Sequence, residues 1–491
     1  MNKSIIEPPN REGFMKLNFF DKRVDWSRLQ GRLCTNWAEK LDGKSCQESY
    51  DAFVEILYET AKMEVPEKRK TARIIPRDRR LLMKKRSKLR KRLLRSKNSI
   101  QVSSIEQQLE AIEEKLIVSH KTELRRKEER AIQNIKNNSK YFYRYAKSKR
   151  VSKSSIGPFV ISGSYVEDPK AKAEALSKQY CSVFSSVPHD EETICKALSV
   201  PGAGGIEDFD FGVAEVVEAI NELKENSSPG PDGVPTVLLK RCRDQIAPAI
   251  ADIWKKSVKE GSIPLILKTG IVSPLHKGGD KTQPNNYRPV TLTSHIIKIF
   301  ERIVSKILKQ YLTKIDVWNE NQHGFRQGRS CVSQLLDHYH KIIDALEDEY
   351  SVNVIYLDFC KAFDKVDHEL LLSKLSTIGI RGNALRWLGN FLIGRKQAVA
   401  LDGFLSSYAA VGSGVPQGSV IGPLLFLIHI ADIDYMLQFS AALSFADDTK
   451  LVMKLKNDED GLNFQKDLES IYHWSLENKM SFNQAKFVHL H

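Results

Sequence analysis

The stretch VNVIYLDFCKAFDKVDHELLLSKL, residues 352–375, combines the two patterns that decide the fold. Its first half is a run of apolar and β-branched residues that ends at Asp358, and its second half has the apolar spacing of a helix. A strand that delivers a carboxylate beside a loop is well placed to hold a divalent cation through oxygen ligands. Aspartate also ends ordinary strands and caps helices, so a purely structural role is the more common alternative for this stretch alone.

A second acidic segment is SFADDTKLV, residues 444–452. Apolar and β-branched residues flank Asp447 and Asp448, which predicts a tight hairpin with two acids at its tip. Adjacent carboxylates repel each other, and a cation shared with Asp358 would relieve that repulsion. An ordinary polar turn is the simpler interpretation of this string by itself.

Two further segments could bind a nucleotide. GSGVPQGSVIGPLLF, residues 412–426, surrounds Gln417 with glycine and proline, so that the backbone could approach a ligand closely. TGIVSPLHKGGDKTQPNNYRPVTLTS, residues 269–294, predicts two strands joined by a polar loop. The hairpin would place Lys277 and Arg288 at matching ends, where they could clamp a triphosphate. A plain glycine and proline loop and a bare surface hairpin are the alternatives.

Taken together, the order and spacing of these segments resemble the reverse transcriptases of non-LTR (LINE-like) retrotransposons of the CR1/jockey type. YLDFCKAFDKVDH resembles the first aspartate motif of that family, GVPQGSVIGPLLF its glutamine motif, and FADD its double-aspartate motif. Other blocks in the family's order are SPGPDGVP (228–235), the block that begins with NNYRP at residue 285, NQHGFRQGRS (321–330) and WSLENKMSFNQAKF (474–487).

The resemblance implies an α+β fold, with the fingers and palm of a right-hand polymerase and an antiparallel palm sheet. It implies an RNA-directed DNA polymerase that adds dNTPs to a DNA 3′ end, with an RNA template, a DNA primer and two Mg²⁺ ions. Asp358, Asp447 and Asp448 would be the metal ligands. The backbone carbonyl of Phe359 would be a further ligand, and Lys486 would protonate the pyrophosphate as a general acid.

The same resemblance implies a set of nucleotide-binding residues. Phe363 would block a ribose 2′-OH and so favour deoxynucleotides, although an aromatic residue of the core is the alternative. Gln417 would position the pair formed by template and nucleotide. Lys277 and Arg288 would bind the triphosphate.

The positive charge of the chain is concentrated in one segment. Between Lys68 and Lys97 stand 16 Lys and Arg residues against one acid, Asp78, whereas the rest of the chain holds 59 basic and 60 acidic side chains. Such a segment is expected to bind polyanions by counterion release, with little sequence preference. The helical pattern over residues 79–145 predicts a basic helical hairpin that clamps nucleic acid. A solvated pair of charged helices is the alternative.

We expect four regions: a helical segment over 1–66, a basic helical nucleic-acid-binding region over 67–150, a linker around one helix over 151–205, and a reverse transcriptase domain of fingers and palm, without a thumb, over 206–491. The sequence contains no run of eighteen apolar residues and no apolar stretch near its N-terminus, which predicts neither a membrane span nor secretion. The seven scattered cysteines favour a reducing compartment, so we expect an intracellular location in the cytoplasm, the nucleus or both.

Only 43 residues follow Asp448, and residues 1–200 contain none of the family's endonuclease motifs. We therefore expect an internal piece of a larger element protein, truncated at both ends. That expectation keeps open a second hypothesis, an inactive remnant or a co-opted RNA-binding protein. A metal-dependent nuclease would share the carboxylates but has no use for Phe363 or Gln417, and Phe363 also disfavours an RNA-templated RNA polymerase.

Overall fold

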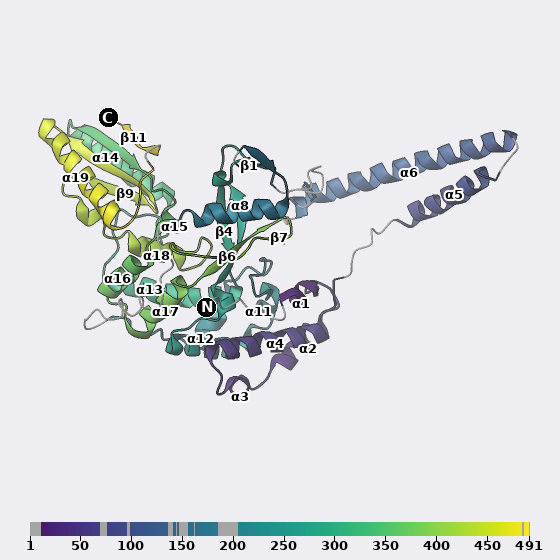
Figure 1. Cartoon of the computed structure of the whole chain (residues 1–491), viewed down its shortest axis with the longest axis horizontal. Helices are drawn as coiled ribbons and strands as arrows, with labels where there is room; N and C mark the ends of the chain where they lie inside the picture. Colours follow the sequence, from purple (N-terminus) through teal and green to yellow (C-terminus); the bar gives the residue numbers. More distant parts are fainter. Residues whose placement is uncertain are drawn as a thin grey trace. The chain divides into compact units, whose positions relative to one another are not determined.

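A computed structural model describes residues 11–68, 76–95, 99–135, 141–143, 145–146, 156–161, 163–184, 205–483 and 486–490. Its internal contacts divide the chain into two units. Unit 1 comprises residues 1–67 together with 156–491, and unit 2 comprises residues 68–155. Figure 1 shows that unit 1 mixes helices and sheets, whereas α5 and α6 of unit 2 are helices. The expected mixture of helix and sheet in an α+β fold is therefore present.

A four-stranded antiparallel sheet carries both acidic segments in unit 1. Its strand order is β11-β5-β10-β9. The strands are β5 (Ser351–Leu357), β9 (Ala441–Phe445), β10 (Asp448–Leu455) and β11 (Val488–Leu490).

Helices pack against both faces of this sheet. Because successive side chains of a strand point to opposite faces, Val452 packs in a small core on the side of α14 (Cys331–Glu347), whereas the preceding residue, Leu451, belongs to the main core of the unit. That main core includes the buried side of α19 (Asp458–Glu477), which contacts β10. The central strand is thus held from both sides.

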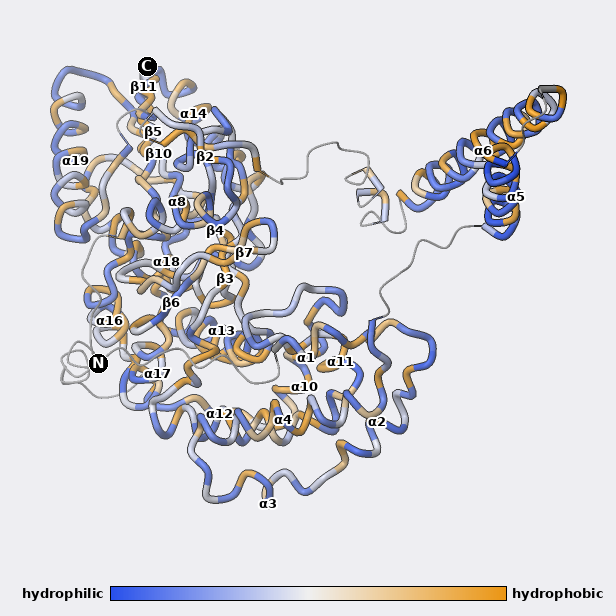
Figure 2. The backbone as a smooth tube through the Cα atoms, turned by 45° about the vertical axis from the view of Figure 1, so that its right-hand side comes forward, coloured by the Kyte–Doolittle hydropathy of each residue, from blue (hydrophilic) through white to orange (hydrophobic). Residues whose placement is uncertain are grey.

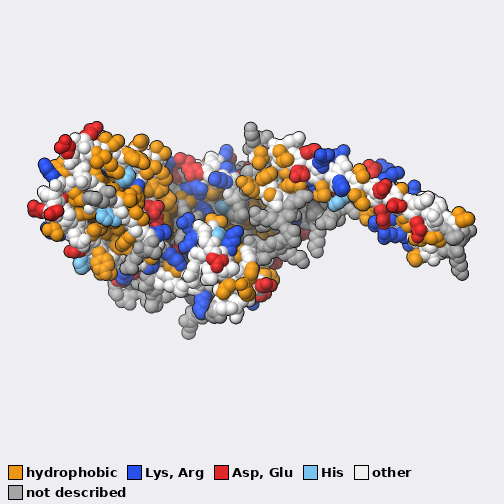
Figure 3. All heavy atoms as spheres, turned by 90° about the horizontal axis from the view of Figure 1, so that it is seen from above, with side chains coloured by type: hydrophobic (Ala, Val, Ile, Leu, Met, Phe, Trp, Pro, Cys, Tyr) orange, Lys and Arg blue, Asp and Glu red, His pale blue; other side chains and the backbone are white. Residues whose placement is uncertain are grey.

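The outward face of α14 is strongly apolar. Its exposed large side chains follow the spacing of one helix face; they are Val332, Leu335, Leu336, Tyr339, Ile343 and Leu346. Figure 3 shows hydrophobic side chains gathered at the end of unit 1 that carries α14 and α19. The helix buries Gln334, His338 and Ala345 instead, so its less apolar side is the one within the fold.

A second, five-stranded sheet holds the basic hairpin. Its order is β4-β3-β6-β7, with β8 also paired to β6. The β3–β4 pair is antiparallel, as the sequence predicts, whereas β3 and β6 run parallel. The strands are β3 (Thr269–His276), β4 (Tyr287–Leu292), β6 (Lys396–Leu401), β7 (Phe404–Leu405) and β8 (Ala409–Ala410).

Three large aromatic side chains tie the main helices of unit 1 together. Phe300 stacks on Trp254 with ring centroids 4.8 Å apart, and it meets Trp387 edge-on at 4.9 Å. These rings come from α13 (His295–Lys314), α12 (Arg243–Glu260) and α17 (Gly382–Leu392).

The other helices that follow residue 205 are α10 (Val213–Asn221), α11 (Thr236–Arg241), α15 (Ala362–Lys365), α16 (His368–Thr377) and α18 (Gly422–His429), with the 3-10 turns η1 (Leu265–Lys268), η2 (Pro284–Asn286) and η3 (Ile433–Met436). None of the helices in the described ranges is both long and apolar enough to cross a bilayer.

The N-terminal helices are part of unit 1. They are α1 (Arg11–Lys16), α2 (Trp26–Leu33), α3 (Trp37–Leu41) and α4 (Cys46–Glu64). The indole nitrogen of Trp37 donates to the carbonyl of Gln245 at 2.7 Å, and the Tyr50 hydroxyl donates to Asp232 at 3.0 Å. Both bonds cross from this segment to residues beyond 205, so the segment shares a core with them.

Residues 156–184 also pack into unit 1, although the sequence suggests a linker there. They form β1 (Phe159–Ile161), β2 (Ser164–Val166) and α8 (Pro169–Cys181). Phe159 meets Tyr287 of β4 edge-on at 5.5 Å, and α8 contacts β6. The expected helix is present, and its apolar residues explain why it packs on the five-stranded sheet instead of spanning open solvent.

The described part of unit 2 includes α5 (Arg77–Leu93) and α6 (Ser99–Gln133), which contact each other. The two packed helices agree with the helical pattern over residues 79–145, whereas clamping of nucleic acid stays a prediction. Arg79 pairs with Glu123 at 2.6 Å, and Arg90 pairs with Glu113 at 2.8 Å. Figure 2 shows α5 largely in hydrophilic colours. Within the stretch YFYRYAKSKR (141–150), which mixes aromatic and basic residues, positions 144 and 147–150 lie outside the described residues.

Candidate active site

Asp358 lies directly after Leu357, the last residue of β5, and its side chain is 16% exposed. β5 pairs with β10 in a register that sets Leu357 opposite Thr449. The next residues beyond this pair are Asp358 on one strand and Asp448 on the other. Two acids therefore lie side by side at the ends of neighbouring antiparallel strands.

The second acidic segment forms the predicted tight hairpin. Phe445 pairs with Asp448, and Ala446 and Asp447 form a two-residue turn between β9 and β10. Ala446 has a φ of 58°. A positive φ at the first central residue is a feature of type II′ turns, which usually place glycine there. Asp447 is half-buried within the turn, and Asp448 is exposed at the start of β10.

The two acidic segments share one electrostatic environment. Burial raises the pKa of Asp447, and the negative charges of Asp448 and Asp358 raise it further, whereas Lys486 acts to lower it. The ammonium nitrogen of Lys486 lies 2.9 Å from Oδ2 of Asp358, and the amide of Asn483 donates to the same oxygen at 3.1 Å. The fold thus gathers three carboxylates and one lysine at one edge of the sheet.

The carboxylates fit the chemistry of a hard divalent cation, because Mg²⁺ prefers oxygen ligands. No group of three or more His, Cys, Asp or Glu side chains in the described part of the chain is arranged as a ready-made metal site. Lys486 supplies the positive charge beside Asp358 here. A cation bound at Asp358 would therefore displace the lysine ammonium from Oδ2 or share that oxygen with it.

Phe359 presents its backbone away from the neighbouring segment. It forms an isolated antiparallel bridge with Phe482, and the flanking hydrogen bonds are made by the carbonyl of Asp358 and the N–H of Cys360. In such a pair the N–H and C=O of the bridged residue point away from its partner. The Phe359 carbonyl is therefore not used in pairing with Phe482, while its buried ring stacks on Phe482 at 4.7 Å.

Phe363 is held by aromatic neighbours. Its ring stacks on Phe426 of α18 with centroids 4.4 Å apart, and it meets Phe325 edge-on at 5.9 Å. The Val415 N–H donates to the carbonyl of Phe363 at 2.8 Å. The segment that holds Gln417 (the glutamine loop, within residues 412–426) therefore contacts Phe363. The ring is half-buried and fixed in orientation.

Gln417 is anchored through its side chain and its backbone. Its amide nitrogen donates to Oδ1 of Asp364 at 3.0 Å, and its carbonyl accepts the N–H of Thr291 in β4 at 2.8 Å. Burial raises the pKa of Asp364 to about 6, with the Gln417 hydrogen bond acting in the opposite direction. The loop therefore joins the segment after Asp358 to the five-stranded sheet.

The glycines of this loop serve the chain's own packing. Gly414 has a φ of 89°, and a Cβ there would lie 2.7 Å from the Asp364 Cα. Gly418 has a φ of 123°, and a Cβ there would lie 2.5 Å from the Thr291 carbonyl oxygen. The interpretation that glycine admits a ligand needs correction at these two positions, because the close approach is to backbone of this protein.

Lys277 and Arg288 lie on the β3–β4 hairpin and are exposed. Arg288 stands opposite Leu275, two residues before Lys277, so both basic side chains project from the same face of the hairpin. No hydrogen bond or ion pair between described residues joins either of them to the acidic cluster. The pKa of Lys361, lowered first by burial, is lowered further by the charge of Lys277. The hairpin is thus within electrostatic reach of the segment that follows Asp358.

Three polar residues that contact this site were not singled out in the sequence. Asn483 binds Asp358, Asp364 binds Gln417, and the Gln322 side chain binds the backbone of Ala446. Each lies within one of the motif blocks named above, but a motif block does not say which group a side chain will meet.

Carboxylates thus lie at adjacent antiparallel strand ends, beside a loop in which Gln417 is anchored. Residues 275–491 match the family model described as reverse transcriptase (RNA-dependent DNA polymerase). These residues are therefore similar to a reverse transcriptase domain, and the relatives that match the chain are named as polymerases or proteins of transposable elements.

Three curated relatives show this similarity. The chain is 31% identical over 251 residues to a probable RNA-directed DNA polymerase from transposon BS of Drosophila melanogaster. This match covers 51% of this chain and 28% of the relative. It is 30% identical over 282 residues to the corresponding probable polymerase from the X-element of that species, covering 56% and 31%. It is 26% identical over 342 residues to the RNA-directed DNA polymerase from mobile element jockey of Drosophila funebris, covering 66% and 37%. The matches thus span about a third of each relative's length.

Proposed function

We propose that this chain is an RNA-directed DNA polymerase that adds dNTPs to a DNA 3′ end on an RNA template. The observation that carries the proposal is the placement of Asp358 and Asp448 at adjacent ends of β5 and β10, with Asp447 in the neighbouring turn. In-line phosphoryl transfer needs carboxylates that converge from separate strands. In this assignment the four-stranded sheet is the palm and the five-stranded sheet belongs to the fingers.

Asp358, Asp447 and Asp448 would hold two Mg²⁺ ions, with the carbonyl of Phe359 as a further ligand. When bound, such ions activate the primer 3′-hydroxyl and stabilise the pyrophosphate leaving group. The three carboxylates orient the site. Lys486 lies close enough to the cluster to lower the pKa of Asp447, and we assign it the protonation of the leaving pyrophosphate.

The incoming nucleotide would lie between the acids and the glutamine loop. The fixed ring of Phe363 would exclude a 2′-OH, and Gln417 would position the template–nucleotide pair. Lys277 and Arg288 project from one face of the hairpin, so they can bind a triphosphate together.

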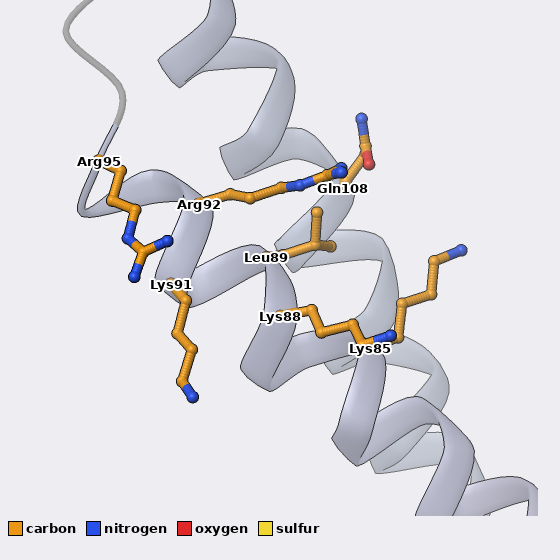
Figure 4. A pocket seen from close by; sticks show the side chains of 7 residues that line it. All are labelled: Lys85, Lys88, Leu89, Lys91, Arg92, Arg95 and Gln108. Atoms are coloured by element: carbon orange, nitrogen blue, oxygen red, sulfur yellow. The ribbon is translucent and has the colours of Figure 1, made fainter.

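Unit 2 would bind the nucleic acid backbone. Lys84, Lys85, Lys88 and Arg92 of α5 are exposed and pair with none of the described carboxylates, whereas Arg79 and Arg90 are neutralised by α6. Figure 4 shows basic side chains of α5 beside α6, with Arg92 extending toward Gln108. These side chains line a hollow of about 430 Å³. A row of free cations on one helix suits phosphates and carries little sequence preference.

An inactive remnant that only binds RNA is the second hypothesis. Both hypotheses place the protein inside the cell, and the basic run KKRSKLRKR (84–92) would serve RNA binding or nuclear import equally well. The two hypotheses differ only in whether a primer is extended.

Primer extension on an RNA template with Mg²⁺ and dNTPs tests the proposal, comparing the full chain with Asp447→Asn. The variant keeps the side-chain shape and removes a ligand charge, so we expect extension to fall about a thousandfold or more. Asp458→Asn, an exposed residue at the start of α19, is the matched control. Equal extension by Asp447→Asn and the unchanged chain would refute the assignment, and RNA binding without extension by either would favour the remnant.

A further inference from the structure

The turn that contains Asp447 is hydrogen-bonded to the side chain of Gln322, which is distant in sequence. Oε1 of Gln322 accepts the N–H of Ala446 at 2.8 Å, and Nε2 of Gln322 donates to the carbonyl of Ala446 at 3.2 Å. Ala446 is 5% exposed and Gln322 is 9% exposed. A single buried amide thus satisfies both polar backbone groups of the residue directly before Asp447.

The segment around Gln322 is itself fixed to the same strand. The N–H of His323 donates to the carbonyl of Ser444 at 2.9 Å, and the N–H of Ser444 donates to the carbonyl of Asn321 at 3.0 Å. Together these bonds form a short parallel bridge alongside β9. The ring of His323 also bonds the Ser333 hydroxyl at 2.8 Å, at the start of α14. Gln322 therefore acts from a rigid base.

Glycine at position 324 permits this approach. A Cβ on Gly324 would come within 2.2 Å of the Ala446 backbone nitrogen. The Gly324 N–H also donates to Oε1 of Gln322 at 2.8 Å, so it fixes the orientation of the amide that holds Ala446. The Q-x-G part of NQHGF has in this way a physical role at the acidic turn.

Ala446 needs such support because of its backbone conformation. A φ of 58° is in the left-handed region, which costs free energy for any residue with a Cβ. A turn in this conformation stays fixed only when its surroundings hold it. Since Asp447 follows in the same turn, the direction of its carboxylate depends on the Ala446 peptide.

We propose that Gln322 is a positioning residue for Asp447, holding the acidic turn in its strained conformation through both polar groups of Ala446. The inference rests on the proposed function for its catalytic consequence, but not for its structural one. Gln322 touches no reacting atom, so its effect would be on the rate of the chemical step and not on nucleotide binding.

The first test measures steady-state extension by the full chain with Gln322→Met, which preserves length and burial but makes neither bond. We expect kcat to fall about a hundredfold, as for a reacting group displaced by about 1 Å, with the KM for dNTP changed less than threefold and primer–template affinity unchanged. Gln334→Met is the matched control, because Gln334 is also a buried glutamine, in α14, and no bond joins it to the turn. Equal losses in both variants, or a loss confined to KM, would overturn the proposal.

The second test does not depend on activity. Hydrogen–deuterium exchange of the segment 441–449 should be at least tenfold faster in Gln322→Met than in the wild-type chain. In Gln334→Met it should equal the wild-type rate. If Gln322→Met does not fold, Gln322→Asn, which is too short to make both bonds, replaces it with the same expectation. Unchanged exchange in a folded variant would overturn the inference. If the unchanged chain extends no primer, the proposed function fails while the exchange rates still decide the role of Gln322.

Discussion

The ammonium nitrogen of Lys486 lies 2.9 Å from Oδ2 of Asp358, and Asn483 donates to that same oxygen at 3.1 Å. Lys486 is 62% exposed, whereas Asp358 is 16% exposed. The pair thus joins a largely exposed cation to a mostly buried acid that we assign as a metal ligand. The lysine and a metal ion would compete for this carboxylate. Lys486 can therefore act on the reaction in two separable ways, by weakening metal binding and by serving as the general acid.

The first prediction separates these two effects with Lys486→Met. Loss of the ammonium should lower the half-saturating Mg²⁺ concentration, since a competing cation is removed from Asp358. Loss of a general acid should lower kcat by roughly a hundredfold or more. Extension kinetics over a Mg²⁺ titration measure both quantities, and Lys454→Met, in the same sheet but paired with Asp348, is the control. A change in Mg²⁺ requirement without a change in kcat would leave Lys486 as a counter-ion only.

The second prediction concerns sugar selection by Phe363. Phe363→Ala should raise ribonucleotide incorporation relative to deoxynucleotides by about tenfold or more, because the ring that would meet the 2′-OH is gone. The ratio of kcat/KM for dNTP and rNTP measures this. Phe363→Tyr keeps the ring stacked on Phe426 and should retain discrimination. If the alanine variant discriminates as before, Phe363 is a packing residue of the α18 contact.

The third prediction uses the raised pKa of Asp364. Burial lifts this pKa from 3.8 to about 6, so between these values the unfolded chain ionises while the folded chain stays protonated. Stability is therefore lost as pH rises through this window, by about 3 kcal/mol in order of magnitude. Asp364→Asn keeps an oxygen for the Gln417 amide and avoids that cost.

Denaturant unfolding at pH 4 and pH 8 measures the predicted effect of Asp364 on stability. The free energy of unfolding of Asp364→Asn should exceed that of the unchanged chain at pH 8, and the two should converge near pH 4. A difference that is the same at both pH values would show that Asp364 does not titrate in this window.

The acidic site was open to prediction from sequence because it depends on local patterns. The apolar and β-branched run that ends at Asp358 and the two-acid turn at Asp447 each define a strand end, and strand order within the sheet places those ends together. The role of Gln322 was not open to prediction, because it depends on a contact across 124 positions of sequence with a backbone group. A motif block can mark such a residue without giving its partner.

The packing of the N-terminal helices could not be predicted from the sequence for a similar reason. Tyr50 meets Asp232 across 182 positions, and both groups are fully buried. The sequence of α4 shows an apolar face but not the surface that covers it. The segment 156–184 likewise has the composition of a connection, and its packing is seen in long-range contacts such as that of Phe159 with Tyr287.

The fourth prediction tests that N-terminal contact. Asp232 is buried, which raises its pKa, and it receives hydrogen bonds from the hydroxyls of Ser294 and Tyr50. Tyr50→Phe removes one donor from a buried acid, which should lower the free energy of unfolding by about 1–3 kcal/mol. Tyr58→Phe, on the same helix, is the control for losing a phenolic hydroxyl. Equal losses in both variants would mean that the bond to Asp232 contributes nothing specific.

The fifth prediction tests whether α5 binds RNA through its free cations. Lys84 and Lys88 are exposed and have no partner among the described carboxylates, whereas Arg79 and Arg90 are paired with Glu123 and Glu113 on α6. Each phosphate contact contributes about 0.7–0.9 to the slope of log affinity against log salt concentration. The double variant Lys84→Gln/Lys88→Gln should therefore reduce that slope by up to about 1.8.

The double variant Arg79→Gln/Arg90→Gln removes the same charge from the side of α5 that is already neutralised. Counterion release depends on contacts with phosphate and not on net charge alone, so its slope should change much less. Filter binding of one RNA by the full chain at several salt concentrations measures both slopes. Two equal reductions would mean that RNA senses only the net charge of unit 2, and two unchanged slopes would mean that RNA binds elsewhere.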